Sequence, residues 1–482
     1  MTTLKHQAAS GVKWSTVSQV SRQGTMLLTT IILARLLTPS DFGLVGMAMV
    51  VIGFIEMFKD LGTSAAIIQK KEIPESLLSS IFWVNAGFGI LSMAVLFFGA
   101  PLGGLFFHEH LVIPILRVLS FGFFISCISI LQKAILERSL AFHTLAKIEI
   151  TAVACGSVTG VGLALLGARV WSLVFQSLTT VLVTTILLWL SSPWKPKWVF
   201  YWQEVRSISS YSLNLVGFKI FNYFARNMDY LLIGRYLGAL ELGYYTLAYR
   251  ILLFPLQNIS GVVVRVMFPV YSSIQDDNLR FSRAYLKVAA TIALITLPMM
   301  MGVFALARPF VLSVFGEQWR PVILLIMILA PIGMIQSVGT TVGAIYLAKG
   351  RTDWMFRWGI VAGLFLMIAF VIGLHWSIMG VAAAYAIASL ILFYPSFAIP
   401  FTLIDLQFKH LLRVLYRPLA NSLIMFASII ALRAMLPTIL SNVTVFCLLI
   451  LSGIIIYCAT SWINNRKQIN ELWNLSGLAR KD

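Results

Sequence analysis

Long apolar runs recur along nearly the whole chain and constrain its fold more than any other feature. Fourteen runs are found, and they are centred near residues 23, 52, 91, 123, 156, 180, 220, 256, 294, 333, 366, 390, 426 and 453. About 20 apolar residues are enough for an α-helix to cross the hydrocarbon core of a bilayer. In lipid the backbone must satisfy its own hydrogen bonds, which a helix does. The sequence therefore predicts an all-α integral membrane protein with about fourteen transmembrane helices.

The composition excludes a large soluble domain. Of the 482 residues, 59% are hydrophobic and only 11% are charged, whereas soluble globular chains carry about 25% charged residues. The net charge of +18 resembles that of nucleic-acid-binding proteins, yet no stretch of the chain is locally basic enough for that function. We therefore expect the lipid bilayer, and no nucleic acid, as a partner.

No pattern in the sequence predicts catalysis, a cofactor or a metal site. The segment His108-Glu109-His110 has a spacing that suits neither a helical pair of ligands nor a closed tetrahedral site. The sequence contains no glycine-rich phosphate-binding loop followed by lysine, so the chain itself is not expected to hydrolyse ATP. We expect a protein that is not an enzyme and has no cofactor. The four cysteines lie within apolar runs, without ligand spacing, and are Cys127, Cys155, Cys447 and Cys458.

The distribution of Lys and Arg predicts the orientation of the chain. If the N-terminus is cytoplasmic, 24 Lys and Arg residues fall on the cytoplasmic side and only seven fall on the outer side. Basic loops resist translocation and remain in the cytoplasm. The bias therefore favours an even number of spans with both termini cytoplasmic. The seven outer residues are Arg35, Arg117, Arg169, Arg235, Arg308, Arg320 and Arg433.

A short segment after the first predicted span recurs 200 residues later. Ala34–Gly43 reads ARLLTPSDFG, and Gly234–Gly243 reads GRYLGALELG. The arginine, a leucine, the acidic residue and the glycine recur in register, and we expect an ion pair between the arginine and the acid to close each turn. The duplication predicts two six-helix lobes in parallel orientation, 1–200 and 201–405, followed by two additional helices and a cytoplasmic tail in 406–482.

The connection between the two predicted lobes is rich in tryptophan and proline. Ser192–Glu204 contains three tryptophans and two prolines. Trp rings favour the headgroup level of a bilayer. We therefore expect this linker to lie on the inner membrane interface and not to be a free tether.

Several segments in both halves of the chain resemble one known family. They are Ser10–Ser15 (SGVKWS), Ala34–Gly43, Ala66–Glu72 (AIIQKKE), Asn222–Asp229 (NYFARNMD), Arg265–Pro269 (RVMFP), Ile274–Asp277 (IQDD) and Val314–Trp319 (VFGEQW). In this order they resemble the polysaccharide transporters of the multidrug/oligosaccharidyl-lipid/polysaccharide (MOP) flippase superfamily, particularly the colanic-acid exporter type. The last two predicted spans and the tail carry no such segment.

This resemblance implies a multi-pass flippase of the bacterial cell inner membrane with the MOP flippase fold. Its substrate would be an oligosaccharide repeat unit on undecaprenyl pyrophosphate, exported for exopolysaccharide, capsule or lipopolysaccharide biosynthesis. Alternating access through a cationic central cavity is the expected mechanism. A polysaccharide polymerase or glycosyltransferase complex is a candidate protein partner. The chain itself is expected to be a monomer, because it holds both lobes.

Four polar residues of the seventh predicted span share one helical face. Lys219, Asn222, Arg226 and Asp229 are spaced by 3, 4 and 3 positions, as neighbours on a helix are. Charges at bilayer depth cost about 3 kcal/mol each by insertion scales, so this face must line the bundle interior or a wet cavity. One interpretation is an Arg226–Asp229 pair that fixes helix packing. The other, which the excess positive charge favours, is a cationic strip that contacts an anionic headgroup.

The first predicted span has a similar polar face around Arg22. Arg22 has no acidic residue within one helical turn, so its partner must come from another span or from the substrate. Glu56 in the second span is the candidate structural partner, and the two interactions could alternate during transport. The residues of this face follow spacings of 3, 4, 3 and 4, and are Ser15, Ser18, Arg22, Thr25 and Thr29.

The remaining candidates have weaker patterns. Glu56 and Asp229 are the embedded acids that could serve ion coupling or a structural pair. Arg265 could receive the pyrophosphate on entry or snorkel to headgroups, and Pro255 in the same span predicts a bend. Four aromatic residues could stack on sugars, although core packing is their commoner role, and they are Trp14, Tyr223, Tyr230 and Tyr249.

These residues favour a pyrophosphate site built from Arg22, Lys219 and Arg226, with Asn222 and Arg265 beside them. Arginine suits this site because its planar fork binds phosphate oxygens in pairs. Two alternatives remain open. A cation-coupled multidrug antiporter of the same superfamily would need embedded carboxylates, which are fewer here than embedded bases. A membrane polysaccharide polymerase would be expected to have a long outer loop, and none is predicted.

Overall fold

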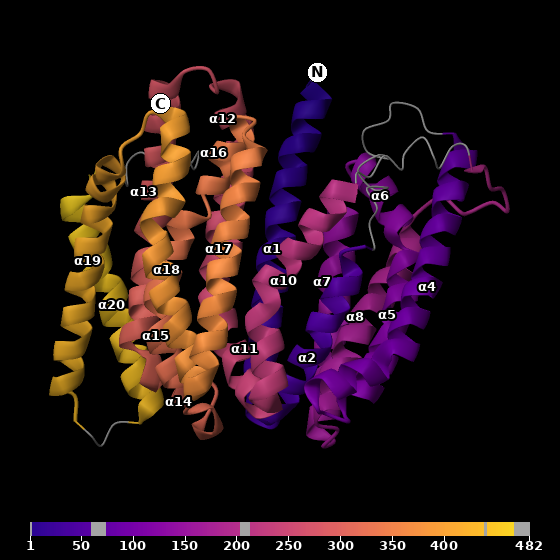
Figure 1. Cartoon of the computed structure of the whole chain (residues 1–482), viewed down its shortest axis with the longest axis horizontal. Helices are drawn as coiled ribbons and strands as arrows, with labels where there is room; N and C mark the ends of the chain where they lie inside the picture. Colours follow the sequence, from indigo (N-terminus) through magenta and orange to yellow (C-terminus); the bar gives the residue numbers. More distant parts are fainter. Residues whose placement is uncertain (1, 59–73, 203–212, 438–440, 467–482) are drawn as a thin grey trace. The chain divides into compact units, whose positions relative to one another are not determined.

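The computed structural model describes residues 2–58, 74–202, 213–437 and 441–466. These ranges are almost entirely helical and contain no β-strand (Figure 1). The chain divides into two compact units, Met1–Gly243 and Tyr244–Asp482. The expectation of an all-α protein is confirmed.

The first unit is built from long helices joined by short connections. Helix α1 packs against α7, α7 packs against α8, and α4 packs against α5, while α10 lies on α2 and α4. These elements are α1 (Thr2–Leu36), α2 (Pro39–Glu56), α4 (Glu75–Phe107), α5 (Val112–Cys127), α6 (Ile130–Arg138), α7 (Phe142–Leu165), α8 (Val170–Ser191) and α10 (Leu213–Tyr236). Helix α11 (Gly238–Pro255) runs from the first unit into the second.

The second unit is organised around α13. Helices α15 and α19 pack against α13, α17 pairs with α18, and α19 pairs with α20. The hydroxyl groups of Tyr285 and Thr341 lie 2.8 Å apart within the buried core of this unit. The helices are α12 (Gly261–Ser273), α13 (Asn278–Ala305), α14 (Ala307–Val314), α15 (Val322–Gly339), α16 (Val342–Ala348), α17 (Thr352–Gly373), α18 (Ser377–Phe401), α19 (Phe408–Met435) and α20 (Asn442–Asn464).

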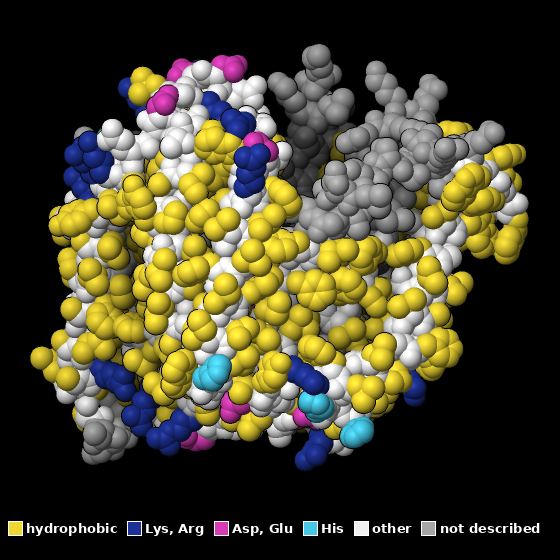
Figure 2. Space-filling view, in the orientation of Figure 1, with side chains coloured by type: hydrophobic (Ala, Val, Ile, Leu, Met, Phe, Trp, Pro, Cys, Tyr) yellow, Lys and Arg dark blue, Asp and Glu magenta, His cyan; other side chains and the backbone are white. Residues whose placement is uncertain are grey.

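Ten helical stretches among the described residues are long and apolar enough to cross a membrane. Every predicted span centre falls in a helical element, and the count of fourteen stays a prediction. The apolar window of α20 is only 11% buried by protein, so its side chains need lipid around them. On the face of the second unit shown in Figure 2, hydrophobic side chains cover the middle and Lys and Arg lie toward the two ends. This distribution is typical of a bilayer-spanning protein.

The boundary between the two units differs in place from the predicted boundary between the lobes. It falls within α11, so that α10 belongs to the first unit. The division at residue 200 rests on the sequence duplication. That division into lobes of 1–200, 201–405 and 406–482 remains a prediction.

The acidic residue of the first repeated turn caps a helix instead of closing the turn with arginine. The Asp41 carboxylate accepts hydrogen bonds from the backbone N–H of Thr38 at 2.9 Å and from its hydroxyl at 2.7 Å. The Thr38 hydroxyl accepts one from the Asp41 backbone N–H, and Pro39 fills the first position of α2. Among the described residues Asp41 forms no ion pair. The expected pairing with Arg35 was therefore wrong, because an acid three residues after a Thr N-cap completes a capping box.

The glycines of the two repeated turns lie where the turns touch each other. A Cβ atom on Gly43 would overlap the carbonyl oxygen of Ala239, and a Cβ atom on Gly243 would overlap that of Pro39. Residues 39 and 239, like 43 and 243, are equivalent under the 200-residue offset. The starts of α2 and α11 therefore meet by reciprocal contacts, as two copies related by a two-fold axis do. Only glycine permits this approach of two backbones.

The linker is fastened to the start of α4 by several contacts. The ring of Trp198 stacks on that of Trp83, with centroids 4.3 Å apart. The Trp83 indole N–H donates a hydrogen bond to the Lys197 carbonyl at 3.0 Å, and the Lys197 ammonium pairs with Glu75. Trp198 is nevertheless 89% exposed, so it remains available to lipid headgroups. The described part of the linker, residues 192–202, is not a free tether, and its place at the inner interface stays a prediction.

Pro255, which the sequence predicts to bend its helix, lies at a change of helix type. Helix α11 ends at Pro255 and a π-helical turn, Leu256–Ser260, leads into α12. The side-chain amide of Asn258 donates to the carbonyl of Phe254 at 2.9 Å. Proline has no backbone N–H, and near it the Asn258 side chain supplies a hydrogen bond to a backbone carbonyl.

The contact at Gly43 yields a first testable prediction. Gly43→Ala should destabilise the protein, because overpacking a close helix contact costs about 1–3 kcal/mol. The matched control is Gly99→Ala in α4, where an added Cβ meets no atom within 4 Å and alanine is the better helix former. Scanning fluorimetry in detergent should give a lower unfolding midpoint for Gly43→Ala and an equal or higher one for Gly99→Ala. Equal midpoints for the two variants would contradict the contact.

Candidate functional site

The polar face of α1 turns toward α7, which it packs against. Ser18 is buried and its hydroxyl donates a hydrogen bond to the Glu149 carboxylate at 2.9 Å. Thr29 is also buried, and its hydroxyl bonds back to the carbonyl of Thr25 at 2.8 Å. The helix spacing thus identified a real inward face, part of which is satisfied within α1 itself.

Arg22 lies on this face and has an unusual environment. One terminal nitrogen of its guanidinium donates to the Gln19 side-chain oxygen at 2.7 Å. Its Nε atom is buried and has no hydrogen-bond partner within the described part of the chain. A buried donor without a partner is costly, so this N–H sets Arg22 apart from a side chain that is fully satisfied within the protein. Within the described ranges no ion pair joins Arg22 to Glu56.

Glu56 occupies a different part of the first unit. It lies at the end of α2 and is exposed. It lines a small cavity of about 140 Å³ together with Ser126 and Ser177. The expected structural pairing of Glu56 with Arg22 is therefore not formed, and its role in ion coupling stays a prediction.

The polar residues of α10 divide between the surface and the interior. Asn222 and Arg226 are exposed, whereas Asp229 is buried and accepts a hydrogen bond from the backbone N–H of Tyr230 at 2.9 Å. In the described structure Arg226 and Asp229 do not form an ion pair with each other. The side chains of Lys219 and Arg265 lie outside the described residues, although their backbones belong to α10 and α12.

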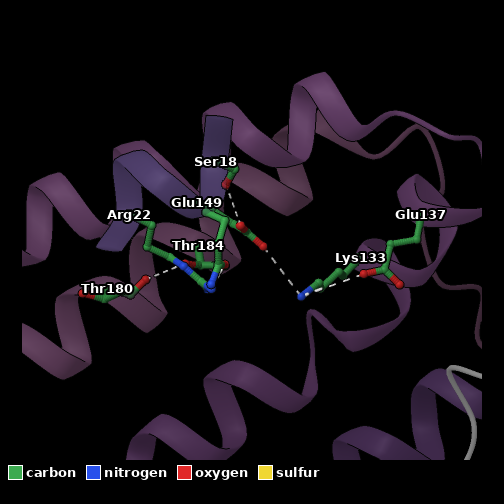
Figure 3. A network of polar contacts seen from close by, with 8 residues as sticks. Ser18, Arg22, Lys133, Glu137, Glu149, Thr180 and Thr184 are labelled. Carbon is green, nitrogen blue, oxygen red and sulfur yellow. Dashed lines mark hydrogen bonds and ion pairs between the residues drawn. The ribbon is translucent and has the colours of Figure 1, made fainter. Parts of the chain in front are cut away.

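A network of charged residues in the first unit includes an acid that the sequence reasoning missed. Figure 3 shows Ser18 and Arg22 of α1, Lys133 and Glu137 of α6, and Glu149 of α7 around one region, with Thr180 and Thr184 of α8. The Lys133 ammonium lies 3.9 Å from a carboxylate oxygen of Glu149 and 3.9 Å from one of Glu137. Two bases and two acids thus meet beside the polar face of α1.

Glu149 could have been found from the sequence. It is the eighth of 24 residues in α7, and so lies about 10 Å along the helix axis from its start. A window of about 20 residues around the fifth span centre contains it. The sequence pattern identified only Glu56 and Asp229 as embedded acids.

Glycines bring α8 close to the site. A Cβ atom on Gly156 of α7 would overlap the Thr180 hydroxyl, and one on Gly160 would lie 2.9 Å from Cβ of Gln176. The two glycines form a G-x-x-x-G pattern, which lets membrane helices approach closely. The Thr184 hydroxyl donates a hydrogen bond to the Thr180 carbonyl at 2.7 Å. The hydroxyl groups of α8 thus lie beside the network, and this one is satisfied within its own helix (Figure 3).

The aromatic candidates mostly pack against protein. Trp14 meets His143 edge to face, with ring centroids 4.3 Å apart. The Tyr223 hydroxyl donates to the carbonyl of Val50 at 2.5 Å. Tyr249 stacks on Tyr245 with centroids 5.4 Å apart. These contacts agree with the commoner role of core packing.

Neither His108 and His110 nor the described part of the second unit offers a comparable site. Arg235 lies 2.9 Å from the His108 ring nitrogen Nε2, and the described residues contain no group of three metal-ligating side chains. In the second unit a cavity of about 350 Å³ lies between α13, α14, α19 and α20. Its lining is almost wholly apolar, with residues such as Met299, Phe310 and Leu449. Such a lining does not suit a charged headgroup.

The fold and the site define a class of protein. Long apolar helices surround partly buried arginine, lysine and glutamate side chains, which is typical of a membrane transport protein. A family model described as "Polysaccharide biosynthesis protein" matches residues 32–324. This match covers more than half of the chain, and the protein belongs to that family.

Individual relatives agree with this assignment. The lipopolysaccharide biosynthesis protein WzxC of Escherichia coli is 28% identical over 77% of this chain and 76% of its own length. The teichuronic acid biosynthesis protein TuaB of Bacillus subtilis is 29% identical over 82% of each chain. The resemblance inferred from the sequence is confirmed.

A solved structure shows the same fold. The lipid II flippase MurJ in an inward closed conformation matches with a TM-score of 0.75 and 18% identity, over 95% of this chain and 100% of that one. The expected MOP-type membrane fold is confirmed.

The glycine contact between α7 and α8 yields a prediction with a control on the same helix. Gly156→Ala should force the two helices apart and lower the heat stability, because its Cβ would meet the Gln176 carbonyl oxygen at 2.8 Å as well as the Thr180 side chain. Gly162→Ala should be harmless, since no atom lies within 4 Å of its Cβ position. Unfolding midpoints and membrane abundance of the two variants provide the measurement. A stable Gly156→Ala protein would show that the contact is not needed.

Proposed function

We propose that this protein flips an oligosaccharide repeat unit, carried on a polyprenyl pyrophosphate such as undecaprenyl pyrophosphate, across the bacterial inner membrane. It would do so as a transporter and not as an enzyme. Its family and the names of its relatives place it in the synthesis of surface polysaccharides. The observation that carries the proposal is Arg22, a half-buried arginine on the inward face of α1, whose Nε–H has no hydrogen-bond partner among the described residues.

The mechanism follows from the cost of moving a pyrophosphate through hydrocarbon. A bare anion would lose its hydration at a prohibitive free energy. Arginine replaces part of that hydration with donors arranged in a plane, which match two phosphate oxygens at once. Arg22 and Arg226, with Lys219, Asn222 and Arg265, would receive the headgroup in turn while the apolar tail stays in lipid. Access from the two sides would alternate.

Orientation and assembly are part of the same proposal. The excess of Lys and Arg in one set of loops supports cytoplasmic termini. The substrate would then enter from the cytoplasm and leave on the outer side. A polymerase or glycosyltransferase complex would receive the product, and the flippase would act as a monomer. Glu56 or Asp229 would be the residue for any ion coupling.

Removing charge at the site tests the proposal. Arg22→Gln and Arg226→Gln should each lower surface polysaccharide about tenfold or more in a complemented deletion strain, because a charge-assisted hydrogen bond is worth about 1.5–3 kcal/mol. Arg22→Lys should restore part of the activity, since it keeps the charge and loses the fork. The control is Arg413→Gln, which removes an exposed arginine from α19. Full activity of both glutamine variants at normal protein level would contradict the proposal.

A cation-coupled drug antiporter is the second candidate, and Glu149 favours it. This acid adds to Glu56 and Asp229 a third carboxylate within the span region, which a transporter of cationic compounds requires. Measuring drug susceptibility of the deletion strain separates the two functions. Increased sensitivity to cationic drugs with normal surface polysaccharide would support the antiporter.

A further inference from the structure

Glu149 on α7 contacts side chains of two other helices. One carboxylate oxygen accepts a hydrogen bond from Ser18 on α1 at 2.9 Å, and the other lies 3.9 Å from the ammonium of Lys133 on α6. Three helices therefore meet at this carboxylate (Figure 3). An acid within a membrane span is costly, so its retention calls for a reason.

The groups around Glu149 are the donors that an anion would use. The Ser18 hydroxyl, the Lys133 ammonium and the Arg22 guanidinium all lie on this region (Figure 3). Carboxylate and phosphate oxygens accept hydrogen bonds from the same donors. The Lys133 and Glu149 side chains are 49% and 31% exposed, so a ligand can reach them without unfolding the helices.

The charges of the cluster balance without a ligand. Arg22 and Lys133 are positive, whereas Glu137 and Glu149 are negative. A pyrophosphate that entered this cluster would therefore meet no net attraction unless one carboxylate withdrew from the donors. Glu149 is the carboxylate that accepts the hydrogen bond of Ser18, and it also lies 3.9 Å from the Lys133 ammonium. The Glu137 carboxylate pairs with Lys133 of the same short helix, at the i, i+4 spacing.

We propose that Glu149 is a placeholder for one phosphate of the pyrophosphate headgroup. This inference rests on the proposed function. In the empty transporter its carboxylate compensates the positive charge and holds the Ser18 and Lys133 donors in position. The arriving phosphate takes over these two donors and the free N–H of Arg22, and the Glu149 side chain moves aside. After transport the carboxylate returns to the donors, competes with the phosphate and favours its release.

The placeholder role predicts that removing the charge of Glu149 raises the affinity for a pyrophosphate. Glu149→Gln keeps the shape of the side chain but removes the charge that repels the phosphate. Farnesyl diphosphate, a short polyprenyl pyrophosphate without sugar, should therefore bind the purified variant about tenfold more tightly than the wild type. Surface polysaccharide in the complemented strain should fall, because release becomes slower. Isothermal titration calorimetry in nanodiscs measures the affinity.

Three further variants complete the experiment. Glu137→Gln removes an acid from the same lysine and should change the affinity less than about twofold. Ser18→Ala removes a donor and should weaken binding several-fold. If Glu149→Gln does not fold, Glu149→Asp, which draws the carboxylate back by one methylene, should fold and bind about threefold more tightly.

The outcomes separate this inference from the proposed function. Equal or weaker binding of farnesyl diphosphate by folded Glu149→Gln, with normal binding by the wild type, would overturn the placeholder role alone. An equal gain in affinity for Glu137→Gln would also overturn it, because the loss of any nearby negative charge would then explain the effect. If neither the wild type nor any variant binds farnesyl diphosphate, both the inference and the pyrophosphate site fail.

Discussion

The cost of a charge among membrane-length helices governs the arrangement of the first unit. Each charged side chain there must find a partner, water or a ligand. Glu149 meets Lys133 and Ser18, and Arg22 meets Gln19 and keeps one buried N–H unused. A cluster whose charges balance leaves no charge unpaired among the helices. In the proposed function the same donors would also receive the anionic headgroup.

Close backbone contacts provide the frame for these charges. In lipid, helices gain little from the hydrophobic effect between them, so they associate through tight packing and small residues. Gly156 lets α8 approach α7 beside the cluster, and Gly43 and Gly243 let the two repeated turns meet. The reciprocal contact at the repeats has a physical basis in the duplication, because equivalent segments offer the same surface to each other. The second unit follows the same rules, although its apolar cavity excludes a charged ligand.

Much of the fold could be predicted from the sequence, because apolar length and helix spacing are local properties. The span centres fall in helices, and the proline expected to bend its span, Pro255, lies where α11 gives way to a π-helical turn. Spacing also identified the inward face of Ser18 and Arg22. It could not say which neighbouring helix meets that face, so Glu56 was expected beside it, whereas the acid that bonds to Ser18 of this face is Glu149. The capping role of Asp41 depends on the hydroxyl of Thr38, and an ion pair was expected there because the sequence offered an arginine nearby.

The central claim is that this protein carries lipid-linked oligosaccharides across the membrane. The most direct test is mass analysis of polyprenyl-linked sugars in cells that lack it, with their sidedness determined by a membrane-impermeant reagent. Complete repeat units should accumulate on the cytoplasmic face and disappear from it when the protein is restored. Normal amounts of these lipids, with the same distribution across the membrane as in the parent strain, would contradict the claim.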